Sequence, residues 1–198
     1  MTDNPRKADY PASQIFLDRW SPRAFTGETI PDDTLATFFE AARWSPSSYN
    51  SQPWRFLYAK KDGPDFAKFL GFLNEGNQSW AKDASVLIIL VSKKTMRVPN
   101  NDKEVFSRTH SFDTGSAWMS FALQASMSGW HAHGMVGFDY DAATKDLNVP
   151  DDHQVEMAIA LGRQGDRSKL PERYQGMEVP NVRKPISETT MAGGFKKA

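Results

Sequence analysis

Apolar residues recur at helical spacing in three parts of the chain. Leu35, Phe38 and Ala42 lie about one turn apart, after an N-cap candidate among residues 31–33. This spacing predicts a helix that ends at the Ser-Pro break that begins at Ser45. The same spacing predicts two further helices, at residues 66–73 and 114–127, and the second is long and rich in small residues.

Three other stretches have the pattern of strands, at residues 54–59, 85–91 and 154–161. The second is almost continuously apolar, which indicates that both of its faces are buried. The third alternates polar residues with Val155, Met157, Ile159 and Leu161. Strands separated by helices imply a sheet covered on its faces, so the predicted fold class is a three-layer α/β or α+β sandwich. The pattern does not show how the strands pair.

A polar loop follows the first predicted helix, with the sequence Ser45-Pro46-Ser47-Ser48-Tyr49-Asn50-Ser51-Gln52-Pro53-Trp54. Its hydroxyls and carboxamides offer donors and acceptors, and its prolines fix local backbone angles. Clusters of this composition are most often turns between two elements. The alternative is a loop that binds a polar planar ligand, such as a heterocycle with a donor and acceptor edge.

A second cluster, Arg19-Trp20-Ser21-Pro22-Arg23-Ala24-Phe25, places two guanidinium groups four residues apart with a serine between them. Arginine matches phosphate oxygens with paired hydrogen bonds, and a serine hydroxyl can add a third contact. A solvated charged turn explains an isolated pair equally well. The presence of both clusters favours a binding site over turn chemistry.

These two clusters, in this order and spacing, resemble the motifs of the nitroreductase family of flavoenzymes. The resemblance continues through Asn77, the apolar run after Asp83, the helix opened by Asp113 and the segment Gly134-Met135-Val136-Gly137-Phe138-Asp139, and it ends with Val182-Arg183-Lys184-Pro185. It therefore covers nearly the whole chain, from Ser13 to Pro185.

The resemblance implies an α+β fold with a central mixed or antiparallel sheet, and an intertwined homodimer with two FMN sites at the subunit interface. It also implies that FMN takes a hydride from NADH or NADPH at N5 and passes it to a nitroaromatic, quinone or related small molecule in a ping-pong cycle. One alternative is a specialised enzyme of the same fold that fragments flavin, removes halogen or reduces enoyl groups or aldehydes. Another is a protein that sequesters FMN or signals redox state through a partner.

The resemblance places a set of residues at the cofactor and leaves the chemistry to flavin N5 rather than to a catalytic side chain. These residues are Arg19, Trp20, Ser21, Arg23, Pro46, Ser47, Ser48, Asn50, Gln52, Asn77, Met135, Val136, Gly137 and Arg183. The arginines and Ser21 belong to the phosphate and ring-edge anion sites. The loop residues hold the ribityl chain and the flavin edge, with Pro46 on the ring. Asn77 binds the pyrimidine, and the backbone N–H groups of Val136 and Gly137 face N5 and O4.

Three positions depart from the family pattern. Gly134 stands where the family's P-x-x-G-F loop has its proline, and Val136 stands where a glutamate is frequent. Trp80 stands where some members place a lysine near the pyrimidine edge, which leaves Arg23 as the cation expected there. These departures bear on the redox potential and the acceptor range more than on the cofactor.

The histidines offer little evidence for a metal site. His131-x-His133 has the spacing of two ligands, but a third ligand at a convincing distance is missing, so we expect no metal. His110 precedes the predicted central helix, and a role as proton donor to the substrate is a hypothesis. Most of the large aromatic residues are expected in the core or in a dimer interface.

Composition fits one compact domain of 198 residues. Lysine plus arginine equals aspartate plus glutamate at 24 each, so the chain has no basic footprint for nucleic acid. The absence of cysteine excludes disulfides, thiol nucleophiles and cysteine-ligated clusters. No apolar run approaches the roughly 20 residues that span a bilayer, and the N-terminus lacks a secretory core, so we expect a cytoplasmic protein. We expect an N-terminal arm at 1–12, one FMN-binding domain at 13–188 and a tail at 189–198.

Overall fold

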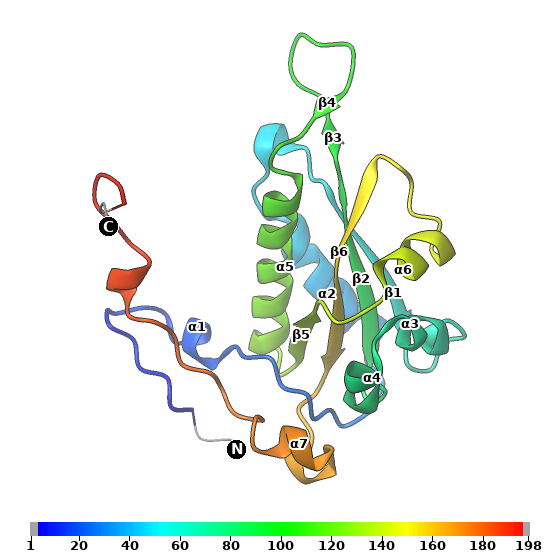
Figure 1. The fold of residues 1–198 in the computed structure, drawn as a ribbon, viewed down its shortest axis with the longest axis vertical. Coiled ribbons are helices and arrows are strands. Elements are labelled where there is room, and N and C mark those ends of the chain that lie inside the picture. The colour runs from blue at the N-terminus through cyan, green and yellow to red at the C-terminus, as the bar shows by residue number, and fades with distance from the viewer. Residues whose placement is uncertain (1–3, 196–198) are drawn as a thin grey trace.

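The computed structural model describes residues 4–195 and shows a sheet covered by helices on both faces (Figure 1). The α-helices are α1 (Gln14–Asp18), α2 (Asp32–Arg43), α3 (Phe66–Phe72), α4 (Glu75–Ala81), α5 (His110–Met127), α6 (Tyr140–Asp146) and α7 (Glu172–Gln175). The strands are β1 (Trp54–Lys60), β2 (Val86–Lys93), β3 (Thr95–Met96), β4 (Val105–Phe106), β5 (His131–Met135) and β6 (His153–Gly162). Short 3-10 turns lie at Ser48–Asn50, Arg167–Lys169 and Ile186–Glu188.

The main sheet is antiparallel, with the strand order β1-β2-β6-β5. Between β2 and β6, Leu90 pairs with Met157 and Val91 pairs with Val155, so Glu156 is an extra residue in a β-bulge. A bulge re-aims the side chain that it carries. Here the Glu156 carboxylate accepts a hydrogen bond from Ser92, at the end of β2.

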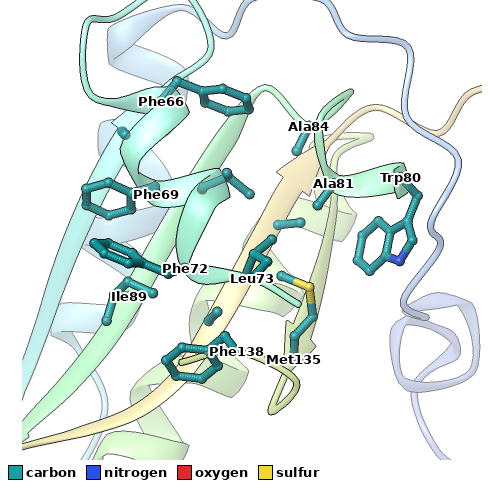
Figure 2. Packing of buried hydrophobic residues seen from close by; sticks show 14 of the residues in the cluster. Phe66, Phe69, Phe72, Leu73, Trp80, Ala81, Ala84, Ile89, Met135 and Phe138 are labelled. Atoms are coloured by element: carbon teal, nitrogen blue, oxygen red, sulfur yellow. The ribbon is translucent and has the colours of Figure 1, made fainter. Parts of the chain in front are cut away.

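Two hydrophobic clusters lie on the two faces of the sheet. Val86, Ile88 and Leu90 of β2 pack toward α2 and α5, whereas the alternate residues Leu87, Ile89 and Val91 pack toward α3, α4 and α6. Figure 2 shows the second cluster, in which the phenylalanines of α3 and Trp80 of α4 lie over the sheet. The alternation explains why β2 is continuously apolar, because each of its two faces is covered by helices.

The predicted helices and strands are confirmed, with shifts at their ends. The central helix α5 begins at His110 rather than at residue 114, so His110 belongs to the helix. The sequence pattern missed α4, α6 and β5. Strand β5 contains histidines and a glycine, which have weak strand preference, and pairing with β6 fixes it in the sheet. At Gly134 of β5, an added Cβ would lie 2.6 Å from Met157 Cε, so a side chain there would require the Met157 side chain to move.

The chain ends run side by side, away from the sheet (Figure 1). The Arg6 side chain donates from Nε to Asn181 O at 2.7 Å, and Ile186 N donates to Asp9 Oδ2 at 3.2 Å. The predicted division into residues 1–12, 13–188 and 189–198 stays a prediction, and its outermost residues, 1–3 and 196–198, lie outside the described part. Across the helices of residues 4–195, none combines the length and the apolar character needed to cross a membrane.

Candidate functional site

The arginine segment, residues 19–24, is an extended stretch that follows α1 and is anchored along its length. Arg6 Nη1 donates to Arg19 O at 2.6 Å, and His133 Nδ1 lies 3.0 Å from Pro22 O. Glu178 accepts from the backbone N–H groups of Arg23 and Ala24. Trp20 is buried, so its indole serves as an anchor rather than as an open binding surface. The segment is thus held before any ligand arrives.

Three guanidinium groups gather at one end of this segment. Burial lowers the pKa of Arg19, and the positive charge of Arg183 lowers it further. Burial and the charges of Arg183 and Arg19 likewise lower the pKa of Arg6. Within residues 4–195, none of the three forms an ion pair, although Arg19 Nη1 lies 3.4 Å from Ser21 Oγ. Mutual repulsion without a carboxylate partner makes this cluster suited to bind an anion.

Two histidines of β5 lie beneath the arginine segment. The ring of His131 meets that of Trp20 edge to face, and the ring of His133 lies 4.8 Å from that of Trp80. Burial, together with the charge of Arg19 near His131 and of Arg23 near His133, lowers the pKa of each histidine to about 4. Trp80 is 2% exposed and packs in the core, so its indole is not an open surface for a ligand.

The neutral histidines predict a stability that depends on pH. Their folded pKa of about 4 lies below the ordinary histidine value of 6.5, so the unfolded chain binds protons first as the pH falls. Stability is therefore full above pH 6.5 and falls between about pH 6.5 and 4, by up to about 1.4 kcal/mol per pH unit for each histidine. In urea titrations of the apoprotein from pH 8 to 5, the variant His131→Gln/His133→Gln should lose less free energy of unfolding than the wild type. Equal slopes would contradict this account.

Asn77 and the turn after β5 meet at the N-terminal end of α4. Asn77 Nδ2 donates to Gly137 O at 3.0 Å, and Asn74 caps α4 by accepting from Asn77 N. At Gly137 an added Cβ would lie 2.5 Å from Asn74 Nδ2 and 2.8 Å from Asn77 Nδ2, so the close approach requires glycine. The Val136 side chain is 74% exposed, whereas Met135 is buried in the core (Figure 2). Met135 is therefore placed to contact a ligand only through its backbone.

The serine loop, residues 45–52, is fixed in an unusual backbone conformation. Tyr49, Asn50 and Gln52 have φ of 51°, 53° and 48°, a region that residues other than glycine rarely adopt. Ser48 N donates to Asp113 Oδ2 at 3.0 Å, and Gln52 N donates to Ser47 Oγ at 3.0 Å. Strain of this kind concentrates at functional sites. Pro46 and Asn50 are exposed, which leaves them available for contacts outside the chain.

His110 lies near the serine loop, in a buried polar cluster. Its Nδ1 lies 2.8 Å from Ser92 Oγ and 3.7 Å from Glu156 Oε1, and Ser111 Oγ donates to Glu156 Oε1 at 2.6 Å. The His110 side chain is only 10% exposed. His110 is therefore a buried residue inside the first turn of α5 rather than ahead of the helix, and its role as a proton donor stays a prediction.

Two groups of the predicted site residues lie at opposite ends of α5. The serine loop contacts Asp113 in the first turn of α5, and the arginine segment packs on His131, just beyond the last turn. Figure 1 shows the end of α2 beside the upper end of α5, while the segment after α1 passes its lower end. The step of 14 positions from Asp113 to Met127 spans about 21 Å of helix. Within one chain, the length of α5 therefore separates the two groups.

Two residues of the site escaped the sequence analysis. Arg6 lies in an arm without a hydrophobic pattern, and Glu178 lies in an irregular stretch rich in charge, glycine and proline. Both act through contacts more than ten residues away in sequence, which no local pattern reports. In the part of the chain that the structure describes, no group of three or more histidine, aspartate or glutamate side chains is arranged to bind a metal ion.

The chain is similar to known proteins in sequence and in fold. The sequence pattern of the "Nitroreductase family" matches residues 17–69 and 58–163. A protein from Bacillus subtilis (strain 168) named "Putative NAD(P)H nitroreductase MhqN" is 24% identical over 193 residues, which cover 82% of this chain and 89% of that protein.

Solved structures are similar over the whole fold. The crystal structure of an oxidoreductase containing FMN is 44% identical, covers 100% of both chains and has a TM-score of 0.94. A nitroreductase family protein from Clostridium difficile 630 is 19% identical, covers 94% of this chain and 100% of its own, and has a TM-score of 0.70. The second likeness bears on the fold alone and agrees with the predicted α+β class.

Proposed function

Because the chain belongs to the nitroreductase family, we propose that it is an NAD(P)H-dependent oxidoreductase that binds FMN between two copies of itself. The observation that carries the proposal is the cluster of Arg6, Arg19 and Arg183, whose mutual repulsion an anion would relieve. The relative described as an oxidoreductase containing FMN, 44% identical over the whole chain, supports this cofactor.

The donor set fits the parts of FMN. Arg19, Arg183 and Ser21 suit the phosphate, because guanidinium groups and a hydroxyl donate to its oxygens. Arg6 donates to three backbone carbonyls, which makes it an anchor for the phosphate site rather than a direct ligand. Asn77 has an amide oxygen and a second amide hydrogen beyond its bond to Gly137, which suits the mixed donor and acceptor edge of the pyrimidine.

A second copy of the chain would complete each site. Ser47, Ser48, Asn50 and Pro46 suit the ribityl chain and the ring, and Gln52 keeps the loop in place by donating from Nε2 to Asn50 O. These residues lie at the far end of α5 from the arginine segment, so they serve the partner's flavin. In a symmetric dimer each chain gives its serine loop to the site of the other chain, so the two sites are equivalent.

The outer face of α5 provides a surface for that dimer. Phe112, Met119 and Met127 follow at spacings of 7 and 8 residues, which places them on one helical face, and they are 80%, 37% and 69% exposed. Trp44, at the end of α2, is 74% exposed. The segment after residue 181, which runs away from the sheet and its helices, adds exposed apolar residues, among them Ile186 and Phe195 (Figure 1). Exposed apolar side chains of this extent mark an interface.

When bound, FMN supplies the redox chemistry by taking a hydride from NADH or NADPH and passing it to a small acceptor such as a nitroaromatic or a quinone. The protein positions the ring and stabilises negative charge at its edge. We expect Arg23 to be the cation at the pyrimidine edge, because Trp80 stands where the resemblance would place a lysine. Backbone N–H groups at Val136 and Gly137 would face the reactive side of the ring.

Anaerobic reduction of the purified protein tests the proposal. We expect a flavin absorbance spectrum that bleaches on addition of NADH or NADPH and returns on addition of a nitroaromatic or quinone. Bound flavin that neither nucleotide reduces would instead support a sequestering protein or a specialised enzyme with another electron source. Absence of flavin after reconstitution with FMN would overturn the proposal.

A further inference from the structure

Glu178 carries a buried carboxyl group to which the proposed function assigns no role. Its side chain is 0% exposed. One oxygen, Oε1, accepts from Arg23 N at 2.7 Å and from Ala24 N at 2.8 Å. The other oxygen, Oε2, is buried and has no hydrogen-bond partner within residues 4–195. A buried acceptor without a partner is unfavourable for folding, so a structural role alone is a weak explanation for a glutamate here.

The three anchors of the arginine segment act on different residues. Arg6 fixes the carbonyl of Arg19, and His133 fixes that of Pro22. Glu178 instead fixes the amides of Arg23 and Ala24, and its contact spans 155 positions of sequence. The three contacts therefore hold different parts of the arginine segment. Glu178 acts at Arg23, the second arginine of the segment.

We propose that Glu178 is a positioning residue that sets the place of Arg23 at the flavin ring, an inference that rests on the proposed function. Two backbone N–H groups directed at one oxygen fix the direction in which the Arg23 side chain leaves the main chain. The guanidinium then lies over the Tyr174 ring, 5.4 Å from its centroid, and the Tyr174 hydroxyl donates to Gly76 O in α4. Glu178 and Tyr174 thus direct Arg23 toward the helix that carries Asn77.

Titration of the apoprotein with FMN tests this role. Glu178→Ala removes the acceptor, and we expect it to weaken FMN binding by about tenfold or more, because small misplacements of binding groups have large effects. Glu178→Gln keeps an acceptor oxygen in place and should bind within about threefold of the wild type. Glu178→Asp, which draws the oxygen back by one methylene, should fall between them. If Glu178→Ala does not fold, the FMN affinity of Glu178→Asp decides. The proposal would be overturned if Glu178→Ala and Glu178→Asp both bound FMN with wild-type affinity. Where Glu178→Ala does not fold, wild-type affinity of Glu178→Asp would overturn it.

Two comparisons separate positioning from a general loss of stability. Phe66→Leu destabilises the buried core at α3, away from the arginine segment, and should leave FMN affinity unchanged while lowering Tm. In double-mutant cycles, Glu178→Ala should lose most of its effect in an Arg23→Ala background and keep it in an Arg19→Ala background. Equal effects in both backgrounds would overturn the role assigned to Arg23. If the wild-type apoprotein binds no FMN, the proposed function fails first, which distinguishes the two failures.

Discussion

The double variant Arg19→Ala/Arg183→Ala should be purified without bound flavin. Each arginine is expected to give a charge-assisted hydrogen bond to the phosphate, worth about 1.5–3 kcal/mol. Together they account for about 3–6 kcal/mol, which corresponds to a loss of roughly 10²–10⁴ in affinity for FMN. Titration of the apoprotein with FMN, followed by flavin fluorescence, measures this loss.

The folded state of the variant should survive the change. Arg6, Arg19 and Arg183 repel one another, so the loss of two of them removes an unfavourable interaction from the apoprotein. We therefore expect a Tm at least equal to that of the wild-type apoprotein. The control variant Arg97→Ala/Arg167→Ala removes the same charge from two exposed positions and should keep its flavin. Full FMN retention in Arg19→Ala/Arg183→Ala would contradict the phosphate site.

A charge at the centre of the apolar face of α5 should give a flavin-free monomer. Met119 lies between Phe112 and Met127 on this face. Met119→Arg would place an unpaired charge in the proposed interface, at a cost of several kcal/mol. Since each proposed flavin site takes one group of residues from each chain, loss of the dimer should also abolish FMN binding. Light scattering during size-exclusion chromatography gives the mass, and absorbance near the flavin band gives the occupancy.

The matched control places the same side chain on another surface. Thr144 is exposed on α6, in the opposite helical layer, so Thr144→Arg should remain a dimer with bound flavin. A Met119→Arg monomer that binds FMN as tightly as the wild type would show that one chain suffices for the site.

The fold was predictable where local pattern and burial coincide. Strand β2 is apolar on both faces because helices cover both, and the pattern reports this directly. Strand β5 is different, since its sequence His-Ala-His-Gly-Met has weak strand preference and depends on pairing with β6. The start of α5 at His110 depends on the buried contact with Ser92 at the end of β2, which lies 18 residues earlier.

The sequence predicted which kinds of ligand group the site residues could bind, but not where these residues lie relative to one another. The two motifs indicated an anion site and a polar loop from their side chains alone. Their separation along α5 follows from the path of α2, which no motif encodes. Arg6 and Glu178 contact the arginine segment from both ends of the chain, so their roles emerge only in the folded protein.

We propose that each flavin site combines the arginine segment of one chain with the serine loop of another. A purified heterodimer of Arg19→Ala/Arg183→Ala with Ser48→Ala/Asn50→Gly tests it, with glycine chosen because Asn50 has φ of 53°. The heterodimer has one site with both wild-type groups and one site with neither. We predict that titration with FMN finds one site per dimer with wild-type affinity, although both parent homodimers bind weakly. A heterodimer in which no site regains wild-type affinity would contradict the account.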